Sequence, residues 1–300
     1  MLNSRIAWTC WALLPVAALV YHYGPGQRAY MQDRAAKLLG NAGVVQERAE
    51  KAQDAAYAKH LAGIAARRAA FVSQSPEDKA VAKAAWVQEE AAYADAAEAW
   101  KSAADSFGEA LGLLTGADAP NVGTVRWARD RALIRSGQIA AGINDLEDLL
   151  ESLPVGEQGM GGGTADKSVS GLETRTREEL ATGYYYGARL MRLGGHPAAE
   201  WREVSGKARQ NFRYLAESGK NKGEDATRVR NLQNNLELVL NLEQSSSEEL
   251  VAKPQPKNSP RADRDGFCDS KGKKKGKKPN GKKRDDSRDG GGQDQIGGGW

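Results

Sequence analysis

The sequence predicts an all-α fold, and three observations carry this prediction. Apolar residues recur at three- and four-residue spacing over most of the chain, as they do along one face of a helix. Runs of beta-branched residues with alternating polarity are absent, and alanine dominates from Ala35 to Ala119. Because Gly, Lys, Pro and Asp dominate after Val251, we expect a middle stretch of roughly 170 residues to hold the apolar core.

The N-terminal segment, residues 1–26, contains an apolar run at residues 6–23 that carries no formal charge. This run is near the short end of the roughly 17–25 residues that span a bilayer. Aromatic residues lie toward both of its ends, as interfacial residues do, at Trp8, Trp11, Tyr21 and Tyr23. We therefore expect an N-terminal membrane helix and a single-pass membrane protein.

Two alternatives remain open for this segment. It is either a signal peptide cleaved near the small residues Val16-Ala17-Ala18, or a segment with no membrane role. The positive charges on the two sides of the run nearly cancel and do not fix its orientation. The tail before the run is very short, and this favours an extracytoplasmic body.

Residues 27–80 predict an Ala-rich helical stalk. This stalk is expected to be helical to about Leu39, interrupted at residues 40–43, and helical again to Val72. Ser75 is expected to cap the next helix, with Pro76 at its first position. That helix is predicted to reach about residue 114. The loop before it is short, so it should fold back onto the stalk, and the many alanines should allow close helix axes.

Residues 81–250 predict a domain of helical hairpins. Beyond residue 114, helices are expected over residues 125–136, 138–153, 174–193, 197–217 and 226–243, separated by breaks that contain Gly or Pro. Residues 251–300 form a tail rich in Lys, Gly and Asp. We expect this tail to be disordered, because it holds too few apolar residues to offset the entropy of ordering.

A small residue followed four positions later by a large apolar one recurs in three of these helices. The three copies are Ala208–Phe212–Leu215–Ala216, Ala103–Phe107–Ala110–Leu111 and Gly142–Leu146–Leu149–Leu150. A small side chain lets a paired helix approach, and the large side chain one turn later fills the gap beside it. We expect residues 174–193 to form the helix that packs on Ala208.

This pattern, over residues 81–245, resembles the tetratricopeptide (TPR) repeat, in which two antiparallel helices pack through small residues. The small residues of the copies, Ala103, Gly142 and Ala208, stand 39 and 66 residues apart, whereas TPR units repeat every 34 residues. The resemblance therefore implies an irregular TPR-like array of antiparallel hairpins. An unrelated antiparallel bundle with Ala-rich seams is the alternative.

The layout is also similar to that of the membrane-anchored TPR subunits that bacteria encode beside von Willebrand factor A proteins in aerotolerance-type gene clusters. Those subunits combine a membrane span, a short TPR region and a charged C-terminus. The similarity implies a location in the bacterial inner membrane.

The sequence contains no group of residues typical of catalysis or metal binding. None of the 3 histidines has a second His or Cys at ligand spacing, and the 2 cysteines lie in the N-terminal run and in the tail. Residues 161–168 superficially resemble a phosphate-binding loop, but Asp166 stands where a glycine is needed. We therefore expect no enzymatic activity, no catalytic residue, no cofactor and no metal ion.

One predicted helix face carries residue types that contribute strongly to binding surfaces. Tyr185, Arg189 and Arg192 are spaced four and three positions apart, and the other stripes of that helix are apolar. In TPR proteins the first helix of each hairpin lines the groove, so the resemblance places this trio there, with Arg126 and Arg129 as further candidates. The alternative is an ordinary solvated helix face.

The sequence thus favours a non-enzymatic, membrane-anchored scaffold that binds a partner protein through a TPR-like groove. The arginines would suit an acidic segment or a C-terminal carboxylate. The net charge of +4 is modest, and no folded segment carries enough positive charge to predict a nucleic-acid-binding face. The alternative function is binding to a polyanion or an anionic surface through the lysines of residues 271–284.

Overall fold

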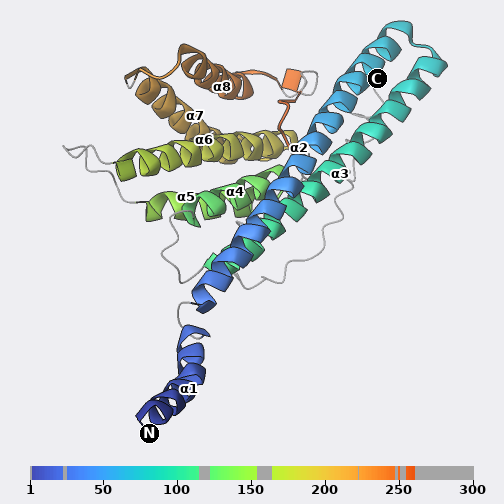
Figure 1. Cartoon of the computed structure of the whole chain (residues 1–300). Coiled ribbons are helices and arrows are strands. Elements are labelled where there is room, and N and C mark those ends of the chain that lie inside the picture. Colours follow the sequence, from blue (N-terminus) through green and yellow to red (C-terminus); the bar gives the residue numbers. More distant parts are fainter. Residues whose placement is uncertain are drawn as a thin grey trace, which may run out of the picture.

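The computed structural model describes residues 2–22, 26–114, 122–153, 164–221, 223–246, 249–250 and 255–260. Within these residues the regular structure is entirely helical, which confirms the all-α prediction (Figure 1). The helices are α1 (Leu2–Tyr21), α2 (Gln27–Ser73), α3 (Pro76–Leu114), α4 (Val122–Arg135), α5 (Ile139–Ser152), α6 (Thr164–Leu193), α7 (Ala198–Asn221) and α8 (Ala226–Gln244).

The first helix, α1, corrects the expectation of a membrane span. Among the helices of the described residues, none is long and apolar enough to cross a membrane. The predicted span at residues 6–23 and the single-pass location in a bacterial inner membrane are therefore wrong. The expectation of an extracytoplasmic body depended on that span and loses its basis. The helix itself forms, but Arg5 lies within its first turns and Thr9 and Pro15 interrupt its apolar run, which was short from the start.

Helices α2 and α3 form one long antiparallel hairpin (Figure 1). They are 47 and 39 residues long, and only Gln74 and Ser75 separate them. Gln74 adopts a left-handed conformation with φ 56°, and the Ser75 hydroxyl accepts a hydrogen bond from the Asp78 amide at 3.0 Å, as expected of a helix cap. The predicted fold-back at this loop is confirmed.

A seam of small residues holds the hairpin together. On α2 these residues recur at every seventh position, and the alanines among them are at most 1% exposed: Ala35, Ala42, Ala49, Ala56, Gly63 and Ala70. On α3 the matching positions are Ala82, Glu89, Ala96, Ala103 and Ala110. Larger buried residues follow on α3 after most of these: Tyr93, Trp100, Phe107 and Leu114. A strict seven-residue repeat is the pattern of a coiled coil, and alanine at the repeating position lets the two axes approach.

The break predicted at residues 40–43 does not occur. Gly40 and Gly43 both face solvent on an unbroken α2, while Ala42 between them is fully buried in the seam. A glycine in the middle of a helix costs about 1 kcal/mol relative to alanine. Contacts with α3 on the opposite face of α2 offset this cost.

The helices α4 to α8 form a body in which each helix packs on the next in chain order (Figure 1). Small residues allow neighbouring helices of the body to approach closely. A β-carbon added to Gly142 on α5 would lie 2.7 Å from the carbonyl oxygen of Asp130 on α4. Ala208 on α7 is fully buried in the core that α7 shares with α6, which agrees with the expected packing of Ala208. The body joins the hairpin through α3 and α4, where Ala132 packs with Ala49 and Trp100.

A short segment, residues 255–260, connects the body to α2 and is called the strap below (Figure 1). The sequence places these residues in a disordered tail, but Ser259 is 3% exposed and Pro260 is buried. The tail prediction is therefore wrong for the strap. The lysine-rich residues 271–284 lie outside the described part of the chain.

Candidate binding cleft

A cleft of about 450 Å³ opens on the helical body beside the strap. Its walls come from α4, α6 and α8, with Phe212 of α7 and the strap completing it. The lining residues are Trp127, Arg131, Arg135, Arg175, Glu178, Glu179, Thr182, Tyr185, Tyr186, Phe212, Asn235, Leu238, Pro256, Lys257 and Asn258. A volume of this size accommodates several side chains of a bound molecule.

The α4 side of the cleft presents an aromatic ring with two arginines. The guanidinium groups of Arg131 and Arg175 lie 5.6 and 5.3 Å from the centre of the Trp127 ring, within the range of a cation–π contact. The indole N–H of Trp127 donates to the Arg175 carbonyl at 3.3 Å, which fixes the ring. The carboxylates of Glu50 and Glu179 lie 3.9 Å from Arg131, at the outer limit of an ion pair.

A buried arginine forms the floor of the cleft. Arg135 is 6% exposed and donates to Glu179 at 3.0 Å and to the Tyr186 hydroxyl at 3.1 Å. Burial lowers the pKa of Arg135, but the charge of Glu179 and the contact with Tyr186 raise it by more, so the net pKa is raised. Arg135 is therefore a permanent cation held in place by its neighbours.

The two tyrosines of the cleft remain neutral hydrogen-bonding groups. Burial raises the pKa of both Tyr185 and Tyr186, and the nearby charges of Arg189 and Arg135 offset only part of this rise. A neutral phenol contributes a rigid apolar ring with one polar atom, a combination common at binding surfaces.

Of the residues expected on the outer face of α6, only Tyr185 lines the cleft. Arg189 is 6% exposed and donates to the Leu250 carbonyl at 3.3 Å. Arg192 donates to the carbonyls of Leu242 and Ser245 and lies 4.7 Å from the centre of the Trp201 ring. The expected exposed trio is therefore not formed, because the chain after α8 folds back over the end of α6.

The other two candidates also lie apart from the cleft lining. Arg129 donates to Asp130 at 2.9 Å and to Asp145 at 2.5 Å, so it fastens α4 to α5. Arg126 is half-buried on α4 and is not among the residues that line the cleft.

The sequence interpretation missed the residues that do form the cleft. Trp127, Arg131 and Arg135 follow one another at four-residue intervals on α4, and this spacing places them on one face. On α6 the corresponding stripe contains Arg175, Glu179 and Tyr186. The helical spacing was thus a usable signal. It does not reveal which face the rest of the chain leaves open.

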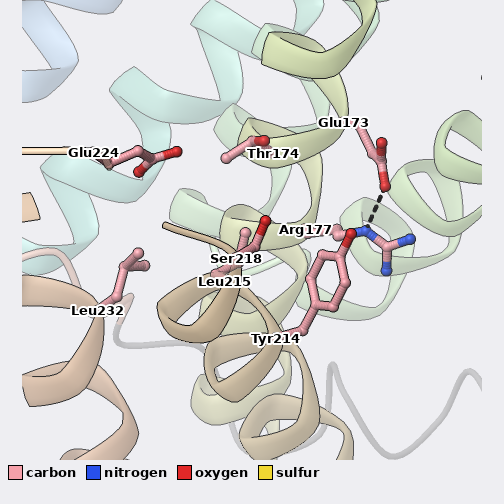
Figure 2. Close-up of a pocket in the computed structure, with 8 residues that line it drawn as sticks. All are labelled: Glu173, Thr174, Arg177, Tyr214, Leu215, Ser218, Glu224 and Leu232. Carbon is pink, nitrogen blue, oxygen red and sulfur yellow. Dashed lines mark hydrogen bonds and ion pairs between the residues drawn. The ribbon is translucent and has the colours of Figure 1, made fainter. Parts of the chain in front are cut away.

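A second cavity between α6, α7 and α8 is too small to bind a ligand. Figure 2 shows its walls, with Arg177 pointing toward Glu173 and Tyr214 beside it. Its volume of about 10 Å³ is close to the minimum for a single water molecule. Arg177 donates to Glu173 at 2.9 Å within α6. Its guanidinium group lies 4.8 Å from the centre of the Tyr214 ring, and this contact joins α6 to α7.

Within the described part of the chain, no group of three or more His, Cys, Asp or Glu side chains is placed to hold a metal ion. Compared with known protein families, curated proteins and solved structures, the chain matches none. The chemistry of the cleft is therefore the main guide to function.

Proposed function

We propose that this protein is a non-enzymatic scaffold that binds a segment of a partner protein in the cleft of its helical body. The observation that carries the proposal is the composition of the cleft, which combines aromatic rings, arginines and an exposed leucine. The aromatic residues are Trp127, Tyr185, Tyr186 and Phe212, and Leu238 on α8 is 40% exposed. Trp, Tyr and Arg are the residue types that contribute most to the affinity of protein interfaces.

The charge of the cleft favours an acidic segment. Its two carboxylates are already paired, since Glu179 accepts from Arg135 and Glu178 accepts from Arg228, each at 3.0 Å. Arg175 makes its described hydrogen bond to a backbone carbonyl, that of Gly171 at 3.3 Å, and this bond leaves its positive charge unneutralised. A carboxylate of a partner would therefore find favourable positive potential between Arg131 and Arg175.

The TPR-like character expected from the sequence agrees with this proposal. In TPR proteins the first helices of successive hairpins line a concave groove for a peptide. Here α4 and α6 each precede a helix that packs on them, and both contribute to the cleft, as does α8. The arrangement supports a peptide-binding role by analogy of layout.

The test begins with selection of peptides from a random display library against the purified full-length chain. The affinity of a selected peptide is then measured by calorimetry for the wild type, for Trp127→Ala and for the double variant Arg131→Glu with Arg175→Glu. We expect each change to weaken binding at least about 10-fold, and the selected peptides to be rich in Asp and Glu.

A matched control carries the same change of charge away from the cleft. Arg213 and Arg230 are both exposed on α7 and α8, so Arg213→Glu with Arg230→Glu should change the affinity by less than about 2-fold. If no peptide is selected, or if the two double variants weaken binding equally, the proposal is wrong.

A further inference from the structure

The strap is held mainly through its backbone. The side-chain amide of Gln53 donates to the carbonyls of Lys257 and Ser259, at 3.1 and 3.2 Å. Arg135 donates to the carbonyl of Asn258 at 2.6 Å, and the amide of Gln255 donates to His60 Nε2 at 3.1 Å. Four polar contacts thus reach backbone groups, and such contacts recognise an extended peptide with little regard to its side chains.

The groups that hold the strap belong to two parts of the molecule. Gln53 and His60 lie on α2, seven residues apart on the face toward α3, and are 3% and 5% exposed. Arg135 lies on α4 and is 6% exposed. Buried polar side chains are costly unless they are hydrogen-bonded, so these three side chains require a polar occupant such as a peptide backbone.

The orientation of the His60 ring is fixed by Glu89, which is itself held by Arg67. His60 Nδ1 lies 2.6 Å from Glu89 Oε1, and Arg67 donates to the other oxygen of Glu89 at 3.1 Å. A carboxylate accepts the Nδ1 hydrogen, so in the neutral ring Nε2 carries the lone pair that accepts from the Gln255 amide. The α2–α3 hairpin thus presents an acceptor and a donor, His60 Nε2 and Gln53 Nε2, in a fixed arrangement.

The polar contacts made by the side chains of the strap contribute little to this attachment. Its described ion pair, Lys257 with Asp54 at 2.9 Å, joins two side chains that are 55% and 58% exposed, and such pairs stabilise weakly. Two buried polar atoms, Gln255 Oε1 on the strap and Arg135 Nε on α4, have no hydrogen-bond partner among the described residues. Arg135 therefore has hydrogen-bonding capacity that the strap does not use, and the strap has an acceptor that the site does not satisfy.

We propose that Gln53, His60 and Arg135 form a binding site for an extended peptide, and that the strap occupies this site in cis as a detachable ligand. Pro256 and Pro260 suit this role, because proline has no N–H group to leave unsatisfied and its fixed φ lowers the entropy lost on binding. Pro256, Lys257 and Asn258 also form part of the cleft wall, so detachment enlarges the cleft. This effect on the cleft rests on the proposed function, whereas the peptide site itself does not.

The first experiment measures strap detachment in the full-length chain. A lysine-specific protease can reach the exposed side chain of Lys257, but it can cut the following peptide bond only when the backbone hydrogen bonds of residues 257–259 open. The cleavage rate therefore follows the detached population. We expect Gln53→Ala to raise this rate at least about 10-fold, as measured by mass spectrometry, with no change in helicity. Gln46→Ala is the matched control, because Gln46 lies seven residues earlier on the same stripe and bonds only to Glu50 in the described structure.

Equal cleavage in the wild type, Gln53→Ala and Gln46→Ala would overturn the proposal. So would wild-type cleavage as fast as that of a free peptide of residues 252–262. Cleavage that rises in Gln53→Ala throughout α2 and α3, rather than at Lys257, would also count against it, because it would indicate general unfolding.

The second experiment supplies the ligand in trans. A labelled peptide of residues 252–262 is titrated into a full-length chain whose residues 255–260 are replaced by alternating Gly and Ser. We expect binding with a dissociation constant below about 1 mM, weaker binding to the wild-type chain because its own strap competes, and loss of binding when Gln53→Ala is added. No binding up to about 1 mM, or binding unaffected by Gln53→Ala, would overturn the peptide site.

A third measurement separates the strap from the proposed function. A peptide selected for the cleft should bind Gln53→Ala at least about 3-fold more tightly than the wild type, since less free energy is spent on displacing the strap. If no cleft peptide exists but the first two experiments succeed, the peptide site stands and the proposed function fails. If a cleft peptide binds both chains equally, the strap does not control the cleft.

Discussion

The fully buried carboxylate of Glu89 lies directly against the backbone of Gly63. A β-carbon added at Gly63 would fall 2.6 Å from Glu89 Oε2, closer than real β-carbons approach. Gly63 occupies one of the seven-residue positions that are otherwise alanine on α2, and Glu89 occupies one of those on α3. The two departures from alanine thus meet in space, and the glycine provides the room that the buried carboxylate needs.

Gly63→Ala should therefore destabilise the protein, even though alanine is the better helix former. We expect the free energy of unfolding to fall by about 1–3 kcal/mol, because the methyl group displaces Glu89 from His60 and Arg67. Urea unfolding followed by circular dichroism measures this. Gly43→Ala is the control: nothing lies within 4 Å of its added carbon, and it should raise stability by up to about 1 kcal/mol.

Glu89→Ala should also destabilise the hairpin, by about 2–4 kcal/mol, because it leaves the buried His60 Nδ1–H without an acceptor. Adding Gly63→Ala to this variant should cost nothing further, since the methyl group no longer meets a carboxylate. A double-mutant cycle should thus give a coupling energy of at least about 1 kcal/mol between the two sites. Additive effects would show that Gly63 and Glu89 do not interact.

Asp130 should make stability depend on pH. Its side chain is fully buried, and this burial raises the pKa of Asp130 from 3.8 to about 6 against the opposing effect of Arg129. The folded state therefore binds this proton more tightly than the unfolded state, so the contribution of Asp130 to stability falls as pH rises from about 4 to 6.

Asp130→Asn removes this pH-dependent contribution to stability. At pH 8 we expect the variant to be more stable than the wild type by up to about 3 kcal/mol, the free energy of the full pKa shift, which already includes the attraction of Arg129. Below about pH 4 this advantage should disappear. Urea unfolding at several pH values measures the difference, and a difference independent of pH would contradict the assignment.

The crossing of α4 and α5 should tolerate no side chain at Gly142. An added β-carbon would lie 2.7 Å from both the Asp130 carbonyl oxygen and Ile134 Cγ1. We expect Gly142→Ala to lower the free energy of unfolding by about 2–4 kcal/mol, because backbone has to move. Thermal unfolding followed by circular dichroism measures this. Gly206→Ala on α7 is the control: nothing lies within 4 Å of its added carbon, and it should be neutral or stabilising.

Local pattern was enough to predict the helices and the tight contacts between them. The roles of Ala103, Gly142 and Ala208 follow from helical spacing, because a small residue before a large one has few uses on a helix other than close packing. The seven-residue seam was not predicted, although its alanines recur in the sequence, because Gly40 and Gly43 indicated a break within it. Glycine on an exposed helix face marks a turn only when no partner helix covers the opposite face.

The binding surface was harder to predict, because segments without a repeating pattern decide which helix faces remain open. Arg189 and Arg192 have the spacing of an exposed stripe, but their partners are backbone carbonyls between Leu242 and Leu250. Every residue offers a carbonyl, so no residue type announces such a contact. The strap was missed for the same reason, since Gln53, His60 and Arg135 hold its backbone and not its side chains.

The most direct test of the binding cleft is to locate a bound peptide on the molecule. A photoreactive benzophenone side chain is placed either at Leu238, which is 40% exposed at the cleft, or at Val87, which is 56% exposed on the distal part of the hairpin. The chain is irradiated with a selected peptide, and the cross-linked product is identified by mass spectrometry. Cross-linking from position 238 and not from position 87 is the predicted result. Cross-linking from position 87 alone would place the binding surface on the hairpin and contradict the account.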